Sequence, residues 1–163
     1  MRYLQISIGL FVAIAVSRFV PHPPNFTSLM ALSFYVPALL GLKYLPILLL
    51  SFIGTDLIIG LHNVTFFTWG SIILIGLCSK FFLKNIISRI LGSLMGASLF
   101  FIVTNFGVWS LGSYGYTLQG FLLCYTLAIP FYAYNLVSTF IFAGIIEGVN
   151  KLHIIDFERL KNS

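Results

Sequence analysis

Long apolar runs, separated by short breaks of proline, glycine, polar or basic residues, occupy most of the chain. A transmembrane helix needs about 20 predominantly apolar residues. Only 8% of the 163 residues are charged, against about 25% in an average soluble domain. The pattern predicts an all-α integral membrane protein with one transmembrane domain over residues 1–150. We expect its six helices near residues 3–20, 27–42, 45–61, 64–82, 89–111 and 129–150.

The lysines and arginines are distributed unevenly between the two ends of these runs. Short cytoplasmic loops retain Lys and Arg, and eight of the nine basic residues share one side if the N-terminus is cytoplasmic: Arg2, Lys43, Lys80, Lys84, Arg89, Lys151, Arg159 and Lys161. Only Arg18 falls on the other side. We therefore expect a multi-pass protein of the cell (inner) membrane with both termini in the cytoplasm. The net charge of +5 then reflects orientation against anionic lipid and indicates no nucleic-acid partner.

Three segments allow or require an interpretation other than a simple membrane span. Residues 112–128 are expected to form an outer loop followed by a short helix at the outer face, before Pro130 begins the last span. Residues 151–163 are expected to form a cytoplasmic tail. The N-terminal run, which reaches Ala13-Ile14-Ala15, also fits a cleaved signal peptide. That alternative stays open beside an uncleaved first helix.

Three polar residues lie at similar depth in three different predicted helices. Asp56, Asn105 and Asn135 are each six residues from the outer end of their run, which places them about 9 Å below the outer surface. Facing lipid, each would be costly. One interpretation is a shared polar pocket that opens outward. The other is hydrogen bonding between helices that holds the bundle together.

Residues near the outer loops extend this candidate pocket. Arg18 can either form an ion pair with Asp56 or contact an anionic ligand. Trp69 and Tyr134 are candidates for stacking on a flat ring, because they lie beside polar residues rather than only in an interfacial aromatic belt. The predicted substrate-binding residues are Asp56, Asn105, Asn135, Trp69, Tyr134, Arg18, His22, Asn25 and His62. We expect no cofactor and no metal, because Cys78 and Cys124 are far apart and the histidines lack helical ligand spacing.

Small residues recur at a spacing of four on three of the predicted helices. Gly9, Ala13 and Ser17 share one face of the first run and form a candidate docking face for a partner subunit. The other two pairs are Gly92 with Gly96 and Gly144 with Gly148. Close packing inside the bundle is the alternative for all of them. Glu147 and Lys151 are expected to form an i,i+4 ion pair.

Four motifs resemble those of a family of uncharacterised small six-helix membrane proteins. They are PHPPNFT at residues 21–27, TDLIIGLH at 55–62, NFGVW at 105–109 and CYTLAIPF at 124–131. That family is in turn similar to the substrate-capture (S) components of energy-coupling factor (ECF) vitamin transporters. The resemblance implies an S-component-like bundle with an outward-facing pocket. It also implies docking of the first helix onto a transmembrane coupling subunit driven by ATPases.

Together these features favour a membrane substrate-binding subunit. It would capture a small, flat, polar-edged molecule, such as a vitamin or nucleobase-like precursor, for ATP-driven import by partner subunits. The chain has no GxxxxGK[ST], GxSxG or HExxH motif, so we expect neither an ATPase nor another enzyme. The alternatives are a self-contained secondary transporter or channel, an integral-membrane enzyme with His22 or His62 as base, and a structural subunit.

Overall fold

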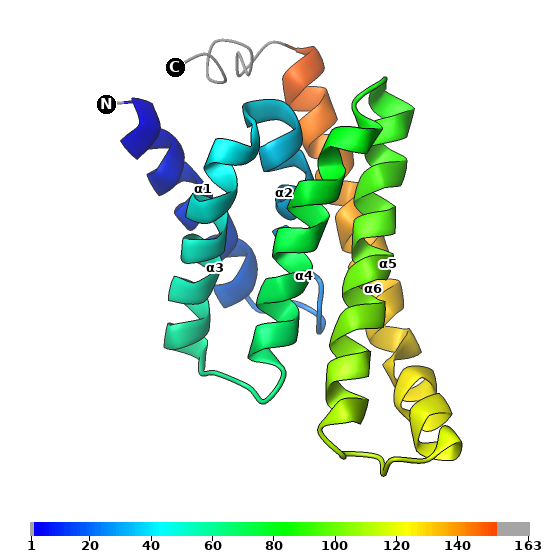
Figure 1. The fold of residues 1–163 in the computed structure, drawn as a ribbon. Coiled ribbons are helices and arrows are strands. Elements are labelled where there is room, and N and C mark those ends of the chain that lie inside the picture. Colours follow the sequence, from blue (N-terminus) through cyan, green and yellow to red (C-terminus); the bar gives the residue numbers. More distant parts are fainter. Residues whose placement is uncertain (1, 153–163) are drawn as a thin grey trace.

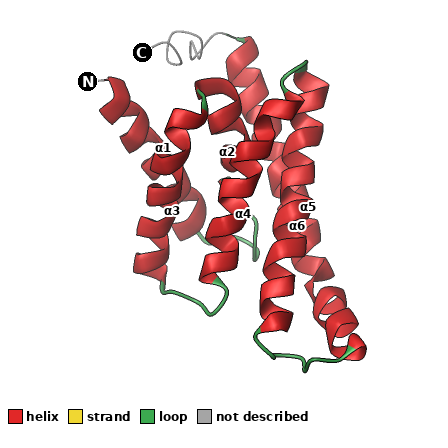
Figure 2. Ribbon diagram, in the orientation of Figure 1, coloured by secondary structure: helices red, strands yellow, loops and turns green. Residues whose placement is uncertain are grey.

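The computed structural model describes residues 2–152, and these form a bundle of helices without any strand (Figures 1 and 2). The predicted all-α class and the number of six helices are confirmed. Their bounds, with the short π- and 3₁₀-helical segments (η), are α1 Arg2–Phe19, α2 Leu29–Tyr35, η1 Val36–Leu40, η2 Leu42–Tyr44, α3 Leu45–Ile59, α4 Thr65–Cys78, η3 Ser79–Phe82, α5 Ile86–Ser110 and α6 Leu118–Lys151. Apart from Lys151 and Leu152, the predicted tail lies outside the described residues.

Four of the helical segments are long and apolar enough to cross a bilayer, judged by length and composition: Leu42–Ile59, Thr65–Phe82, Ile86–Ser110 and Leu118–Lys151. The apolar helices Leu4–Phe19 and Leu29–Leu40 are shorter. The bundle has two ends. At the terminal end, α1 begins and α6 finishes, whereas the connections at residues 60–64 and 111–117 lie at the opposite, cavity end (Figure 1).

The last helix differs from the prediction. A separate short helix before Pro130 is wrong, because α6 is one helix of 34 residues with Pro130 in its interior. Thr117 caps it, its side chain accepting a hydrogen bond from the Gly120 amide at 3.0 Å. The first turns of α6 also bind α5, where the Tyr125 hydroxyl donates to the Ile102 carbonyl at 2.7 Å. These contacts extend the α5–α6 hairpin beyond the α3–α4 connection (Figure 1).

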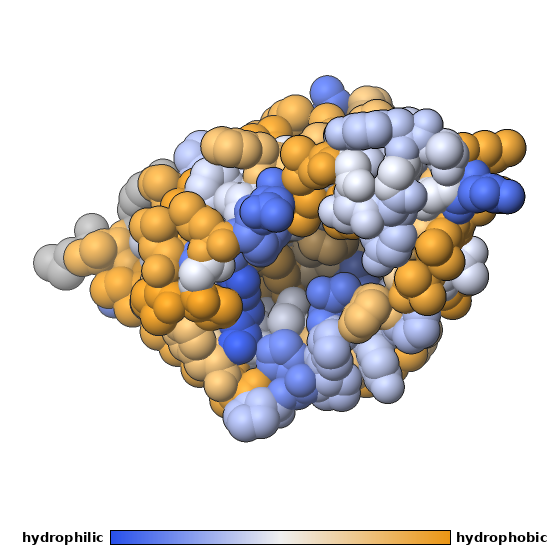
Figure 3. Space-filling view, turned by 90° about the horizontal axis from the view of Figure 1, so that it is seen from below, coloured by the Kyte–Doolittle hydropathy of each residue, from blue (hydrophilic) through white to orange (hydrophobic). Residues whose placement is uncertain are grey.

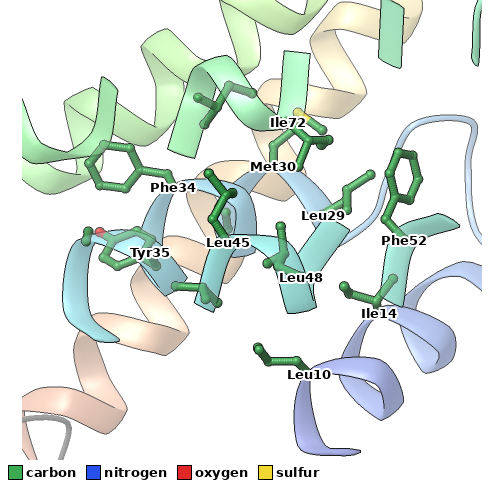
Figure 4. Packing of buried hydrophobic residues seen from close by; sticks show 14 of the residues in the cluster. Leu10, Ile14, Leu29, Met30, Phe34, Tyr35, Leu45, Leu48, Phe52 and Ile72 are labelled. Carbon is green, nitrogen blue, oxygen red and sulfur yellow. The ribbon is translucent and has the colours of Figure 1, made fainter. Parts of the chain in front are cut away.

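Helix α2 is the shortest and lies in the centre, packed on α4, α5 and α6. With η1 it covers 12 residues, about 18 Å at the α-helical rise and well short of the roughly 30 Å of a bilayer core. The prolines at positions 21, 23 and 24 restrict the chain before it. Buried side chains of α1, α3 and α4 form one hydrophobic core with those of α2 (Figure 4). Because α2 begins only at Leu29, it leaves space at this end of the bundle for a cavity.

The small residues at a spacing of four have two different surroundings. A Cβ atom on Gly92 of α5 would lie 2.6 Å from ring carbons of both Phe34 and Phe82, and one on Gly96 would lie 2.9 Å from Ile75. These two glycines therefore permit close helix packing. A Cβ on Gly144 of α6 would meet nothing within 4 Å, and the same holds for Gly148 and for Gly9 of α1.

Replacing Gly92 with alanine is expected to lower the free energy of unfolding by about 1–3 kcal/mol, because the added methyl group overpacks the contact with Phe34 and Phe82. Gly144→Ala is the matched control. It should leave stability unchanged or raise it by up to about 1 kcal/mol, because alanine favours a helix over glycine. Thermal unfolding of the purified protein in detergent measures both. Equal destabilisation by the two variants would contradict the packing.

Candidate functional site

A cavity of about 520 Å³ opens at the cavity end of the bundle. Seen from this end, the surface is hollowed, and hydrophilic side chains border the hollow (Figure 3). Its wall comes from the end of α1, the α1–α2 connection, the start of α2, and α3 to α6. Leu29 and Met30 contribute the first turn of α2 to the wall. The short central helix thus creates a pocket of the size usual for small-molecule sites.

One side of the cavity is a continuous face of α5 and α6. The contributing residues recur at helical spacing: Phe100, Phe101, Thr104, Asn105 and Val108 on α5, and Ala128, Phe131, Tyr132 and Asn135 on α6. The rings of Phe101 and Tyr132 are stacked, with centroids 4.5 Å apart and planes 24° from parallel. The Tyr132 hydroxyl lies 2.7 Å from the Ser98 hydroxyl. This wall offers aromatic surface to a flat molecule.

Two amide side chains lie in the same wall. Asn135 is only 3% exposed, yet its side chain forms no hydrogen bond with any residue between 2 and 152. Asn105 donates from Nδ2 to the Phe101 carbonyl at 2.7 Å, while its Oδ1 accepts nothing from the described part of the chain. Neither amide is among the fully buried polar atoms that lack a partner, because both side chains line the cavity. Both amides therefore have unused capacity to bond a ligand.

The predicted acid belongs to a closed network beside the cavity. Asp56 is 1% exposed and does not line the wall. Its Oδ1 lies 2.6 Å from Arg18 Nη2, and its Oδ2 accepts a hydrogen bond from Trp69 Nε1 at 2.7 Å. Of the two alternatives for Arg18, the ion pair with Asp56 is observed. The network joins α1, α3 and α4 near the cavity end of the bundle.

Arg18 itself lines the cavity while Asp56 and α3 hold it in place. Its Nη1 donates to the Thr55 hydroxyl at 2.5 Å and to the Phe52 carbonyl at 3.4 Å. Its guanidinium carbon lies 4.6 Å from the centre of the Phe52 ring. Nη2 forms the ion pair with Asp56, and the Nε–H, the fifth N–H donor of the guanidinium, has no acceptor among the described residues.

Three further predicted residues lie at the rim. His22, Asn25 and His62 all line the cavity. His22 Nδ1 lies 2.7 Å from the Pro23 carbonyl, and the Asn25 carbonyl accepts from the Ser138 hydroxyl at 3.4 Å. The His62 side chain is exposed. Within residues 2–152, no three His, Cys, Asp or Glu side chains are grouped as a metal site requires.

The family of the chain follows from its match to one family model. That model, for a family of unknown function (DUF6580), matches residues 2–160. The chain belongs to the DUF6580 family. No curated protein and no solved structure matches it. This membership agrees with the predicted resemblance to an uncharacterised family, whereas the further similarity to S components stays a prediction.

Sequence reasoning placed some residues of this DUF6580 protein at the site that the structure does not bring there. Asp56 and Trp69 bind each other behind the wall. Tyr134 is 44% exposed and is absent from the wall, because adjacent helix positions point about 100° apart. The prediction missed Phe101, Phe131 and Tyr132. Helical spacing could have found them, since they lie three or four residues before Asn105 or Asn135.

The candidate docking face on α1 of the DUF6580 protein is only partly free. Gly9 and Ala13 are exposed. Ser17, however, donates to the Ile14 carbonyl at 3.0 Å and accepts from the Ser28 hydroxyl at 2.8 Å. Ser17 therefore fixes the α1–α2 connection, and the exposed small face of α1 ends at Ala13.

A second buried ion pair of the DUF6580 protein lies at the terminal end, away from the cavity. Glu147 of α6 is 5% exposed. It accepts hydrogen bonds from Arg89 Nε at 2.7 Å, from Arg89 Nη2 at 2.6 Å and from the Tyr35 hydroxyl at 2.9 Å. The predicted pair with Lys151 is wrong, because the carboxylate bonds α2 and α5 while Lys151 is exposed. No sequence spacing marks this contact, since Arg89 and Glu147 are 58 residues apart.

Proposed function

We propose that this DUF6580 protein is a multi-pass protein of the cell membrane with an S-component-like bundle, whose cavity faces outward and whose termini are cytoplasmic. Four long apolar helices support membrane insertion. Five of the six basic side chains that the structure describes lie at the terminal end: Lys43, Lys80, Lys84, Arg89 and Lys151. Arg18 is the one described basic side chain at the cavity end. Such an asymmetry favours a cytoplasmic terminal end.

Within this setting, the protein captures a small, flat molecule with a polar edge, such as a vitamin or a nucleobase-like precursor, from the outer side. The observation that supports this most is the unpartnered Asn135 amide in a wall that also holds the Phe101–Tyr132 stack. An amide offers one acceptor and two donors. It can therefore bond the mixed edge of a heterocycle while the aromatic rings contact its face.

Import of the captured molecule requires energy from partner subunits. The chain contains no GxxxxGK[ST] phosphate loop, so ATP would be hydrolysed by separate ATPases acting through a transmembrane coupling subunit. The exposed small face at Gly9 and Ala13 of α1 is the docking surface in this proposal, because small residues let helices approach closely.

Asn135→Ala is expected to weaken ligand binding about 5- to 150-fold, the equivalent of losing one to a few hydrogen bonds inside a dry pocket. Mass spectrometry of the purified protein identifies a co-purifying molecule, and thermal shifts with vitamins and nucleobases identify further ligands. Val137→Ala, on the exposed face of the same helix, is the control and should bind normally. If Asn135→Ala binds the ligand with unchanged affinity, the binding site lies elsewhere in the protein.

A self-contained secondary transporter is a second candidate, and the buried Glu147–Arg89 pair is the observation that favours it. Ionisable residues inside membrane helices often belong to ion-coupled transport. Uptake of an identified ligand into liposomes that contain this chain alone would support this candidate. Uptake only in the presence of partner subunits would support the capture subunit.

A further inference from the structure

We infer that the molecule bound in the cavity carries a carboxylate or a similar anionic group beside its flat ring, and that Arg18 receives this group. The inference rests on the proposed binding function and names the class of its ligand. It depends on which charged groups at the cavity are already paired with one another in the structure.

The acidic side chain nearest the site cannot bind a cationic ligand. Both oxygens of Asp56 are engaged, one by Arg18 and one by Trp69, and the side chain lies behind the wall. The described wall contains no aspartate and no glutamate. A ligand ammonium group would therefore meet a guanidinium without a free carboxylate to balance it.

Arg18, in contrast, retains a donor that suits an anion. Its hydrogen bonds to Thr55 and Phe52 both come from Nη1 and its ion pair with Asp56 is made by Nη2, which leaves the Nε–H without an acceptor among the described residues. The same three contacts hold the planar group in place before a ligand arrives. A carboxylate accepts a charge-assisted hydrogen bond from a guanidinium, and a fixed guanidinium loses little freedom on binding.

The remaining polar groups divide the cavity into two parts. His62 lies in the wall with Arg18 and can donate a hydrogen bond to the same anionic group. His22 is instead held by the backbone, since its Nδ1 lies 2.7 Å from the Pro23 carbonyl and its Nε2 lies 3.4 Å from the Arg18 carbonyl. Asn105 and Asn135 come from α5 and α6, within the aromatic wall. Amides bond donors and acceptors alike, so they fit the neutral polar edge of the ring. The arrangement favours a flat cyclic acid over the corresponding amide or amine.

The test uses matched probes that differ only in charge. They are nicotinate and nicotinamide, 4-aminobenzoate and 4-aminobenzamide, orotate and orotamide, and the cation 3-(aminomethyl)pyridine. Affinities are measured on the intact protein in detergent by isothermal titration. We expect at least one acid to bind 10-fold or more tightly than its amide, and the cation to bind most weakly. Amides or the cation binding as tightly as the acids would overturn the inference and leave the proposed binding function standing.

A double variant assigns the preference to Arg18. Arg18→Gln with Asp56→Asn replaces the ion pair by two neutral amides, which avoids leaving the buried Asp56 carboxylate unpaired. The preference for acid over amide should fall to about 2-fold or less, whereas Asn135→Ala should weaken both members of a pair equally. A preference that survives in the double variant overturns the role of Arg18. If no probe and no co-purifying molecule binds the native protein, the proposed function fails and this inference with it.

Discussion

Replacing Glu147 with alanine is expected to lower the free energy of unfolding by about 3–5 kcal/mol. Glu147 accepts two hydrogen bonds from Arg89 and one from Tyr35, and so joins α2, α5 and α6 at the terminal end of the bundle. Without the carboxylate, the Arg89 guanidinium remains mostly buried with no opposite charge. The Tyr35 hydroxyl, almost fully buried, loses its acceptor at the same time.

Two controls separate the lost ion pair from a general loss of packing. Lys151→Ala removes the exposed residue that helical spacing pairs with Glu147, and should change stability by no more than about 0.5 kcal/mol. Arg89→Met combined with Glu147→Leu removes both charges and should recover most of the lost stability, because hydrophobic replacement of a buried ion pair is often neutral. Chemical unfolding in detergent micelles measures all three. Equal effects of Glu147→Ala and Lys151→Ala would contradict the observed pairing.

The helices were predicted well from the sequence where the length of an apolar run alone determines where a helix begins and ends. The breaks at Gly41, Gly60 and residues 111–117 separate segments that cannot continue as one helix. The error at the start of α6 has a local cause. Proline is favoured in the first turn of a helix, so Pro130 resembled a beginning. Contacts of Tyr125 and Cys124 with the backbone of α5 instead hold the earlier residues in the same helix.

Only those features of the candidate site that depend on positions within one helix could be predicted from the sequence. Asn105 and Asn135 are equally far from the outer ends of their predicted helices, which predicted that they lie close together. Both line the cavity. Rotation about the helix axis decided the rest: Tyr132 shares a face with Asn135, whereas Tyr134 does not. Pairing between helices is not encoded in spacing. The sequence left the Arg18–Asp56 ion pair as one of two alternatives, and the fold was needed to show that pair and the hydrogen bond from Trp69, 13 residues from Asp56 in the chain.

Removing the charge partner at the cavity end should be equally damaging. Arg18→Ala is expected to lower the free energy of unfolding by about 3–5 kcal/mol, because the Asp56 carboxylate is then left buried with only the Trp69 N–H for a partner. His62→Ala is the matched control, since this exposed cavity residue is not part of the ion-pair network. It should unfold like the native protein. Similar stability of the two variants would show that the Arg18–Asp56 pair does not hold α1 against α3.

Asp56→Asn distinguishes a residue that supports the site from one that touches a ligand. Asparagine can still accept the Trp69 hydrogen bond but removes the charge facing Arg18, so stability should fall by about 1–3 kcal/mol. Because Asp56 does not line the cavity, the affinity for an uncharged amide probe, measured at a temperature where the variant is fully folded, should change less than about 3-fold. Asn135→Ala should show the opposite result, with a larger loss of affinity than of stability. If Asp56→Asn instead lost affinity as strongly as Asn135→Ala, the carboxylate would have to reach the ligand directly, and the ion pair with Arg18 would have to open on binding.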